Sequence, residues 1–194
     1  MDIDQFYKMD SDSSFIAELI DEKQPDFDHH KLIEGNYEGI KFPVYLKHYL
    51  GTKKLRDILH TDFCAKLISE KLKNILEENH ITGWKTYPIK LFYKRMIPIE
   101  GYYGFSVVGR CGPIDYSKSK IVKCVQPDIG YTFKAYKGLY IGLDKWDGSD
   151  FFFPEGTQHT IVTQRVVDIL KDFSKQIEFT NLADQTTDCT LVKI

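Results

Sequence analysis

Cys111, within Gly109-Arg110-Cys111-Gly112-Pro113, is the side chain whose type and setting come closest to those of a catalytic nucleophile. The adjacent arginine can lower the pKa of the thiol and so favour the reactive thiolate. Nucleophilic catalysis also needs a base that accepts the proton, and the sequence assigns no histidine to that role. A lone cysteine is more often a small buried residue. We therefore expect no covalent chemistry at Cys111 and no catalytic residue in the chain.

Two further runs approach known motifs without matching them. The run Gly104-Phe105-Ser106-Val107-Val108-Gly109 has one residue too many before its second glycine for a nucleophile elbow. Asp144, Asp147 and Asp150 surround a glycine, but not in the order of a calcium loop. No phosphate-binding G-K-[ST] run and no cysteine–histidine spacing of a zinc site occurs. We expect neither a metal nor a cofactor.

The cysteines and the N-terminus indicate a compartment. The four cysteines are far apart in the sequence and form no C-x-x-C pair, which is typical of free thiols in a reducing environment. The first residues lack the basic and apolar regions of a signal peptide, and no apolar run reaches the length of a membrane span. We expect a cytoplasmic protein that does not enter a membrane.

Charge is distributed unevenly along the 194 residues. Residues 1–39 contain eleven acidic residues and three lysines, whereas the rest of the chain contains 17 acidic and 23 basic residues. This asymmetry predicts an acidic N-terminal extension over residues 1–50, partly helical, followed by a domain over residues 51–194. Residues 14–20 form a capped apolar stretch that could be a short helix. The sequence leaves open whether the acidic segment packs on the domain or binds a partner.

The middle of the chain is typical of strands. Residues 84–141 are rich in aromatic and β-branched residues, and glycines and prolines divide them into short segments. A mainly antiparallel sheet is the simplest assembly of such segments.

A helix–strand unit occurs twice in the sequence. In each copy an apolar dipeptide, a hydroxyl residue (Ser69 or Thr163) and an apolar stripe of helical spacing precede a short break and a strand. The stripes comprise Ile68, Leu72, Ile75 and Leu76 in the first copy and Val162, Val166, Ile169 and Leu170 in the second. We therefore predict an α+β fold, a mainly antiparallel sheet flanked by two amphipathic helices, with a possible internal helix–strand repeat.

The runs at residues 67–89, 107–119, 161–170 and 177–180 resemble the immunity proteins of bacterial polymorphic-toxin systems. More narrowly, they are similar to a family long described only as a bacterial domain of unknown function. In that family a strand ends near an Asp-x-x-x-Ser element, here Asp115 and Ser119, and a second capped helix closes the domain. The resemblance covers residues 55–182. It implies a small cytoplasmic protein that binds and neutralises a cognate toxin, and it carries over no catalytic residues.

Two other functions stay open. Residues 85–140 contain ten basic and three acidic residues among many tyrosines and phenylalanines, a pattern that suits a nucleic-acid-binding module because basic groups meet phosphates and aromatic rings stack on bases. Alternating sheet residues produce the same pattern, and we expect no tight binding of nucleic acid. The third reading is a small hydrolase that uses Cys111.

The run at residues 143–150 is the candidate contact with a toxin. It combines a tryptophan, Trp146, with three carboxylates, Asp144, Asp147 and Asp150. Buried aromatic residues anchor protein interfaces, and acidic rims speed the encounter with a basic partner. The alternative is that the Trp146 ring folds back onto the sheet.

Overall fold

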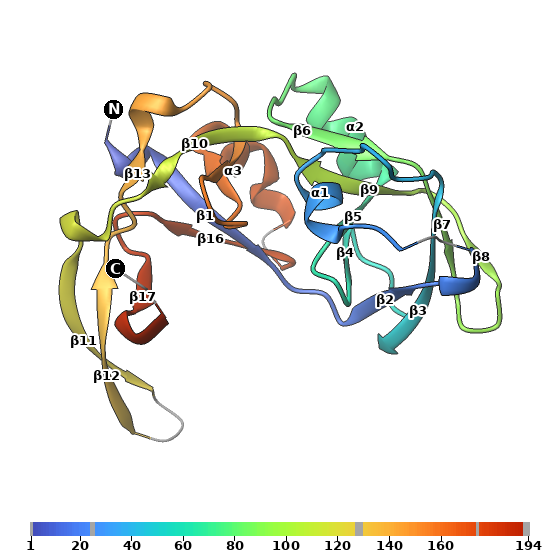
Figure 1. Cartoon of the computed structure of the whole chain (residues 1–194), viewed down its shortest axis with the longest axis horizontal. Helices are drawn as coiled ribbons and strands as arrows, with labels where there is room; N and C mark the ends of the chain where they lie inside the picture. The colour runs from blue at the N-terminus through green and yellow to red at the C-terminus, as the bar shows by residue number, and fades with distance from the viewer. Residues whose placement is uncertain (1, 24–25, 127–129, 174, 192–194) are drawn as a thin grey trace.

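The protein is described by a computed structural model that covers residues 2–23, 26–126, 130–173 and 175–191 (Figure 1). In these ranges the chain forms seventeen strands in three sheets and only three α-helices, α1 (His29–Ile33), α2 (Glu70–Glu78) and α3 (Gln164–Leu170). None of the helices described is long and apolar enough to cross a membrane.

The predicted α+β class is wrong, because the protein is mostly β. The helical spacing includes Ile68 and Val162 at the start of each stripe, but both are strand residues, and α2 and α3 begin only after Ser69 and Thr163. β-branched residues favour strands, and a short apolar run has no periodicity that separates the two states. Each helix is therefore about two turns long. Residues 14–20 likewise contain strand β2, not a helix.

The first sheet has eight strands in the order β6-β9-β5-β4-β2-β3-β7-β8. Its strands are β2 (Phe15–Leu19), β3 (Val44–Gly51), β4 (Ile58–Thr61), β5 (Lys66–Ser69), β6 (Trp84–Tyr87), β7 (Ile89–Phe92), β8 (Pro98–Ile99) and β9 (Tyr102–Val107). The second sheet has six strands in the order β13-β10-β14-β15-β1-β16. Its strands are β1 (Phe6–Ser11), β10 (Gly109–Ile114), β13 (Ile141–Gly142), β14 (Phe151–Pro154), β15 (Ile161–Thr163) and β16 (Ile177–Asn181).

The third sheet is small and consists of β11 (Lys120–Gln126), β12 (Tyr131–Lys137) and β17 (Thr186–Asp188). Strands β11 and β12 form a long hairpin that extends away from the body of the molecule, at the lower left of Figure 1. We call the hairpin formed by β11 and β12 the arm.

The second sheet repeats the topology of the first. Its order β16-β1-β15-β14-β10-β13 matches β6-β9-β5-β4-β2-β3 strand for strand, and every neighbouring pair has the same relative direction. In the first sheet α2 links β5 and β6, which flank β9. In the second sheet α3 links β15 and β16, which flank β1. That middle strand is exchanged between the sheets. Strand β1 immediately precedes β2 of the first sheet in sequence but pairs in the second sheet, and β9 immediately precedes β10 of the second sheet but pairs in the first.

The contacts between the two sheets repeat as well. Asp57, just before β4, accepts a hydrogen bond from the hydroxyl of Ser69 (2.6 Å) and is bonded by Gln176, which precedes β16. Asp150, just before β14, accepts from the hydroxyl of Thr163 (2.9 Å) and is bonded by Thr82, which precedes β6. Each carboxylate therefore ties its own sheet to the other one.

One core lies between the two sheets and contains the buried faces of both helices. Leu72, Leu76, Val166 and Leu170 are buried there, as the helical spacing predicts. The core also takes residues from exchanged strands, Met9 of β1 and Phe105 of β9. Because each sheet contributes to the same apolar cluster, we expect the two to stabilise each other.

Candidate functional site

Trp146 lies against the second sheet. Its ring contacts the ring of Phe6 at 5.1 Å between centroids and that of Phe152 at 5.6 Å, and its indole N–H donates to the carbonyl of Ser149. The side chain is half-buried. Aromatic contacts of this kind stabilise a fold, so part of the ring is already used within the chain.

The three carboxylates of the same run have different surroundings. Asp144 is exposed. Asp147 accepts hydrogen bonds from Ser149 and from the backbone N–H of Arg110; although partial burial raises its pKa, these bonds lower the pKa below the usual range. Asp150 is buried, and besides Thr82 and Thr163 it contacts Arg165 at 3.3 Å. The four residues therefore lie in one short segment, but only Asp144 is free of such contacts with its surroundings among the residues described.

Cys111 lies in β10 with only 4% of its surface exposed. Burial, together with the nearby Asp147, raises the pKa of its thiol to about 12. A neutral thiol is a poor nucleophile, so these surroundings oppose the lowering that an adjacent arginine was expected to cause. Among the described residues, no group of three or more histidines, cysteines or carboxylates is placed to hold a metal ion.

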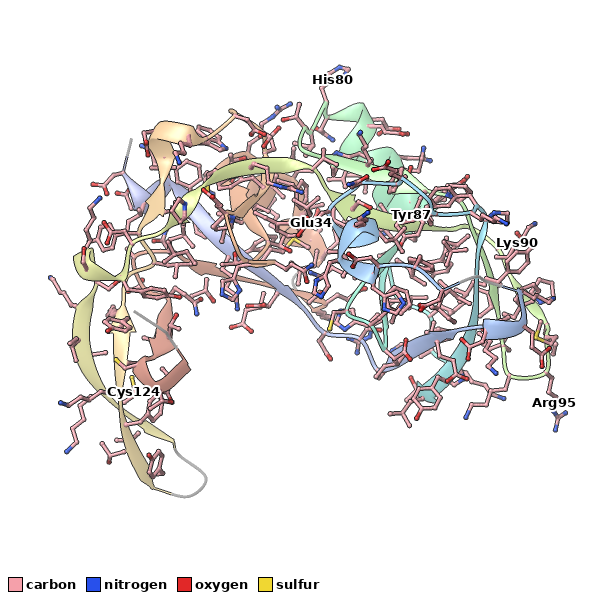
Figure 2. The ribbon with its side chains drawn as sticks, viewed as in Figure 1. Glu34, His80, Tyr87, Lys90, Arg95 and Cys124 are labelled. Carbon is pink, nitrogen blue, oxygen red and sulfur yellow. The ribbon has the colours of Figure 1, made fainter. Side chains whose placement is uncertain are left out.

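The arm presents apolar side chains to solvent. Ile121 is 64% exposed and Val125 is 58% exposed, and alternation along β11 places them on one face with Lys123 between them. Tyr136, Lys134 and Thr132 lie opposite these three residues on β12. An open groove of about 500 Å³ runs along the hairpin, lined by Ile121, Val122, Lys123, Thr132, Phe133 and Lys134. Figure 2 shows side chains standing out from the arm, with Cys124 labelled.

The charges of the arm are unbalanced. Lys123 lies directly opposite Lys134, and Lys120 lies directly opposite Lys137. Like charges directly opposite one another destabilise a sheet. Lys137 is paired with Asp184 at 3.0 Å, but the other three lysines form no ion pair with any residue of the described ranges. Alternation along β11 puts the two pairs on opposite faces of the arm, so an anionic surface on the face of Lys123 and Lys134 would relieve the repulsion between those two.

The sequence pattern predicts strands here, within the basic stretch 85–140, but it does not distinguish these residues as a surface. The signal was present: β11 has apolar residues at 121, 122, 124 and 125, and so on both of its faces. What the sequence did not show is that this hairpin projects from the body instead of joining the main sheets. The face with Ile121 and Val125 is apolar and exposed, which makes it a candidate interface.

The chain matches a model described as an immunity protein family, Imm11, over residues 16–184. The matched region runs from the start of β2 past the end of β16 and includes the arm. No curated protein matches the chain.

Proposed function

Because the chain belongs to the Imm11 family of immunity proteins, we propose that it binds a cognate bacterial toxin and neutralises it as a non-catalytic partner. We propose the cytoplasm as its location, because a reducing compartment suits its four free cysteines. Residues 1–50 supply β1, β2 and most of β3 to the two main sheets, and we also propose that acidic side chains among them add to the toxin-binding surface.

The arm is the surface that we propose for the toxin. The observation that carries this proposal is the exposed pair Ile121 and Val125 beside lysines without ion pairs. Apolar side chains that lose water at the centre of an interface provide affinity, and surrounding charges provide orientation. The partner is therefore expected to present an apolar patch bordered by Asp and Glu residues.

The test is a binding titration with the toxin domain encoded beside this chain. Ile121→Glu and Val125→Glu together should weaken binding by about thirtyfold or more, the equivalent of one hot-spot residue. Lys123→Glu with Lys134→Glu should weaken binding less and slow association. Neither pair should change thermal stability by more than ~0.5 kcal/mol, because these side chains are exposed.

Ile97→Glu is the matched control. Ile97 is also an exposed aliphatic residue, at 56%, but lies between β7 and β8 of the first sheet. The Ile97→Glu variant should bind the toxin as tightly as the wild type. Undiminished binding by the arm variants, or an equal loss in Ile97→Glu, would show that the contact lies elsewhere, with Asp144 and Trp146 the next surface to test.

One observation favours the nucleic-acid alternative. Tyr131 is 58% exposed and stacks on Phe133 at 6.3 Å, on the face of the arm opposite Lys123 and Lys134. However, Ile121 and Val125 offer no ring on which a base could stack. Oligonucleotide binding that is tighter than about 10⁻⁶ M at physiological salt and falls steeply as salt is added would favour this function over toxin binding.

A further inference from the structure

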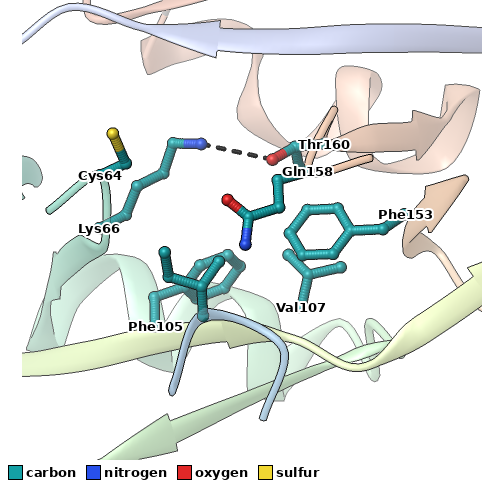
Figure 3. Close-up of a pocket in the computed structure, with 8 residues that line it drawn as sticks. Cys64, Lys66, Phe105, Val107, Phe153, Gln158 and Thr160 are labelled. Carbon is teal, nitrogen blue, oxygen red and sulfur yellow. Dashed lines mark hydrogen bonds between the residues drawn. The ribbon is translucent and has the colours of Figure 1, made fainter. Parts of the chain in front are cut away.

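A cavity of about 230 Å³ lies where the two main sheets meet (Figure 3). It is lined by residues from both sheets, from α1 and from the loop between β14 and β15. These residues are Ile33, Cys64, Lys66, Phe105, Val107, Phe153, Gln158 and Thr160. Pockets that bind small ligands often lie at the junction of two structural units.

The lining divides into an apolar wall and a polar end. Phe105, Val107 and Phe153 are buried side chains that form the wall, and Figure 3 shows the Lys66 ammonium, the Gln158 amide and the Thr160 hydroxyl facing the same space. Cys64 is exposed and lies at the edge of the cavity. A few convergent polar groups over an apolar surface are typical of a pocket that orients an amphipathic small molecule.

Lys66 is a cation without an anion. Its ammonium reaches from β5 to the hydroxyl of Thr160 at 3.3 Å, and it has no salt bridge with any carboxylate in the ranges described. The nearby Asp10 is paired with Lys8 at 2.8 Å. Burial lowers the pKa of Lys66, an effect that Lys8 increases and that Asp10 and Cys64 oppose. An ammonium has three donors, so most of its hydrogen-bonding capacity is open to a ligand.

The neighbouring groups leave Lys66 as the dominant charge. Burial lowers the pKa values of His60 and His159, assisted by Lys66 and Lys8 respectively, so both rings are neutral at pH 7. Gln158 is held in place through a 2.9 Å hydrogen bond between its amide nitrogen and Nδ1 of His30. The polar end therefore offers one positive charge and fixed neutral dipoles, which suits a monoanion.

The repeated topology shows that the fold does not dictate the residue types that line this cavity. The register makes Lys66 equivalent to Thr160, Val107 equivalent to Ser11 and Phe153 equivalent to His60. The Ser11 hydroxyl and Nε2 of His60 hydrogen-bond to each other at 2.9 Å. The apolar wall and the lysine thus occur at positions where the other half of the molecule has different chemistry.

We propose that this cavity binds a small monocarboxylate with an apolar body. The carboxylate lies on the Lys66 ammonium and the Thr160 hydroxyl, and the body lies against Phe105 and Phe153. A cavity of 150 Å³ can hold benzene, so the volume here accommodates a ring or short chain plus a carboxylate, roughly ten non-hydrogen atoms. This inference is independent of toxin binding.

The test uses phenylacetate and hexanoate as probes on the full chain. Titration followed by ligand-observed NMR should show saturable binding with a dissociation constant of about 1 mM or tighter for ligands of this size. Phenylacetamide, which lacks the charge, and sulfate, which lacks the apolar body, should each bind at least tenfold more weakly. Sulfate binding as tight as that of phenylacetate would overturn the proposal, because the site would then accept any anion.

Lys66→Met should weaken phenylacetate binding at least tenfold, whereas Lys85→Met, at an exposed lysine of β6, should leave it unchanged. A second readout needs no variant. Bound phenylacetate should slow the alkylation of Cys64 severalfold and leave that of Cys124, on the arm, unaffected. The absence of saturable binding, unchanged affinity in Lys66→Met, or equal alkylation of Cys64 with and without ligand would each overturn the proposal.

Discussion

Burial decides the reactivity of Cys111 more than its neighbour Arg110 does. Its pKa of about 12 lies above the usual thiol value, so the thiolate fraction is small at pH 7 and rises only as pH approaches that value. Iodoacetamide at pH 8, followed by mass spectrometry of the peptides, should modify the exposed Cys64 much faster than Cys111. Rapid, selective modification of Cys111 would revive the hydrolase reading.

Trp146 tests whether the 143–150 run is a contact or part of the scaffold. Its ring packs on Phe6 and Phe152, so Trp146→Ala should lower the free energy of unfolding by about 2 kcal/mol or more. Asp144→Ala, at an exposed position two residues before Trp146, should leave stability unchanged. Thermal unfolding and toxin affinity should be measured on both variants. Unchanged stability with weaker toxin binding would favour the contact proposed from the sequence.

The helices α2 and α3 contribute to the shared core through equivalent leucines. Leu76→Ala and Leu170→Ala should each destabilise the protein by roughly 2–5 kcal/mol, because both side chains are about 1% exposed. Ile97→Ala, at an exposed position, should cost no more than ~0.5 kcal/mol. Urea unfolding monitored by circular dichroism measures all three. An unaltered midpoint for either leucine variant would mean that the helix packs elsewhere.

The sequence predicted the buried faces of these helices and the hydroxyl residues at their starts. Ser69 caps α2 through a 3.1 Å bond from the backbone N–H of Leu72, but Thr163 makes no such bond to α3 and instead donates to Asp150. Local spacing identifies an amphipathic stripe, since neighbours along a helix are near in sequence. Strand partners are distant in sequence, so the exchange of β1 and β9 and the exposure of the arm could not be found from local pattern.

The polar sites show the same limit. Lys66 and Thr160 are 94 residues apart, and only the meeting of the two sheets makes one cavity of them. In the sequence Asp150 is one of three acidic residues in a run, whereas its equivalence to Asp57 is visible only in the register of the two sheets. Residue type gave the candidate chemistry, and long-range pairing decided which candidates face solvent.

At the scale of the whole molecule, strand exchange should make the two main sheets unfold together. Strand β1 lies between β15 and β16 of the second sheet but continues in sequence into β2 of the first sheet. Strand β9 lies between β5 and β6 of the first sheet but continues into β10 of the second. Unfolding of one sheet should therefore disrupt the other. The two tryptophans report on the two sheets, because Trp84 is in β6 and Trp146 packs on the second sheet. Fluorescence of Trp84→Phe and Trp146→Phe variants should therefore give urea transitions with the same shape.

For that comparison each single-tryptophan variant needs its own reference, because the substitution itself alters stability. Circular dichroism, which averages over both sheets, should coincide with the fluorescence transition in each variant if unfolding is two-state. Deleting residues 1–12 removes β1 from the centre of the second sheet and should abolish the cooperative transition at both tryptophans. Retention of a native transition at Trp84 in the truncated chain would instead show that residues 1–12 form a separable extension and that the first sheet is stable without its partner.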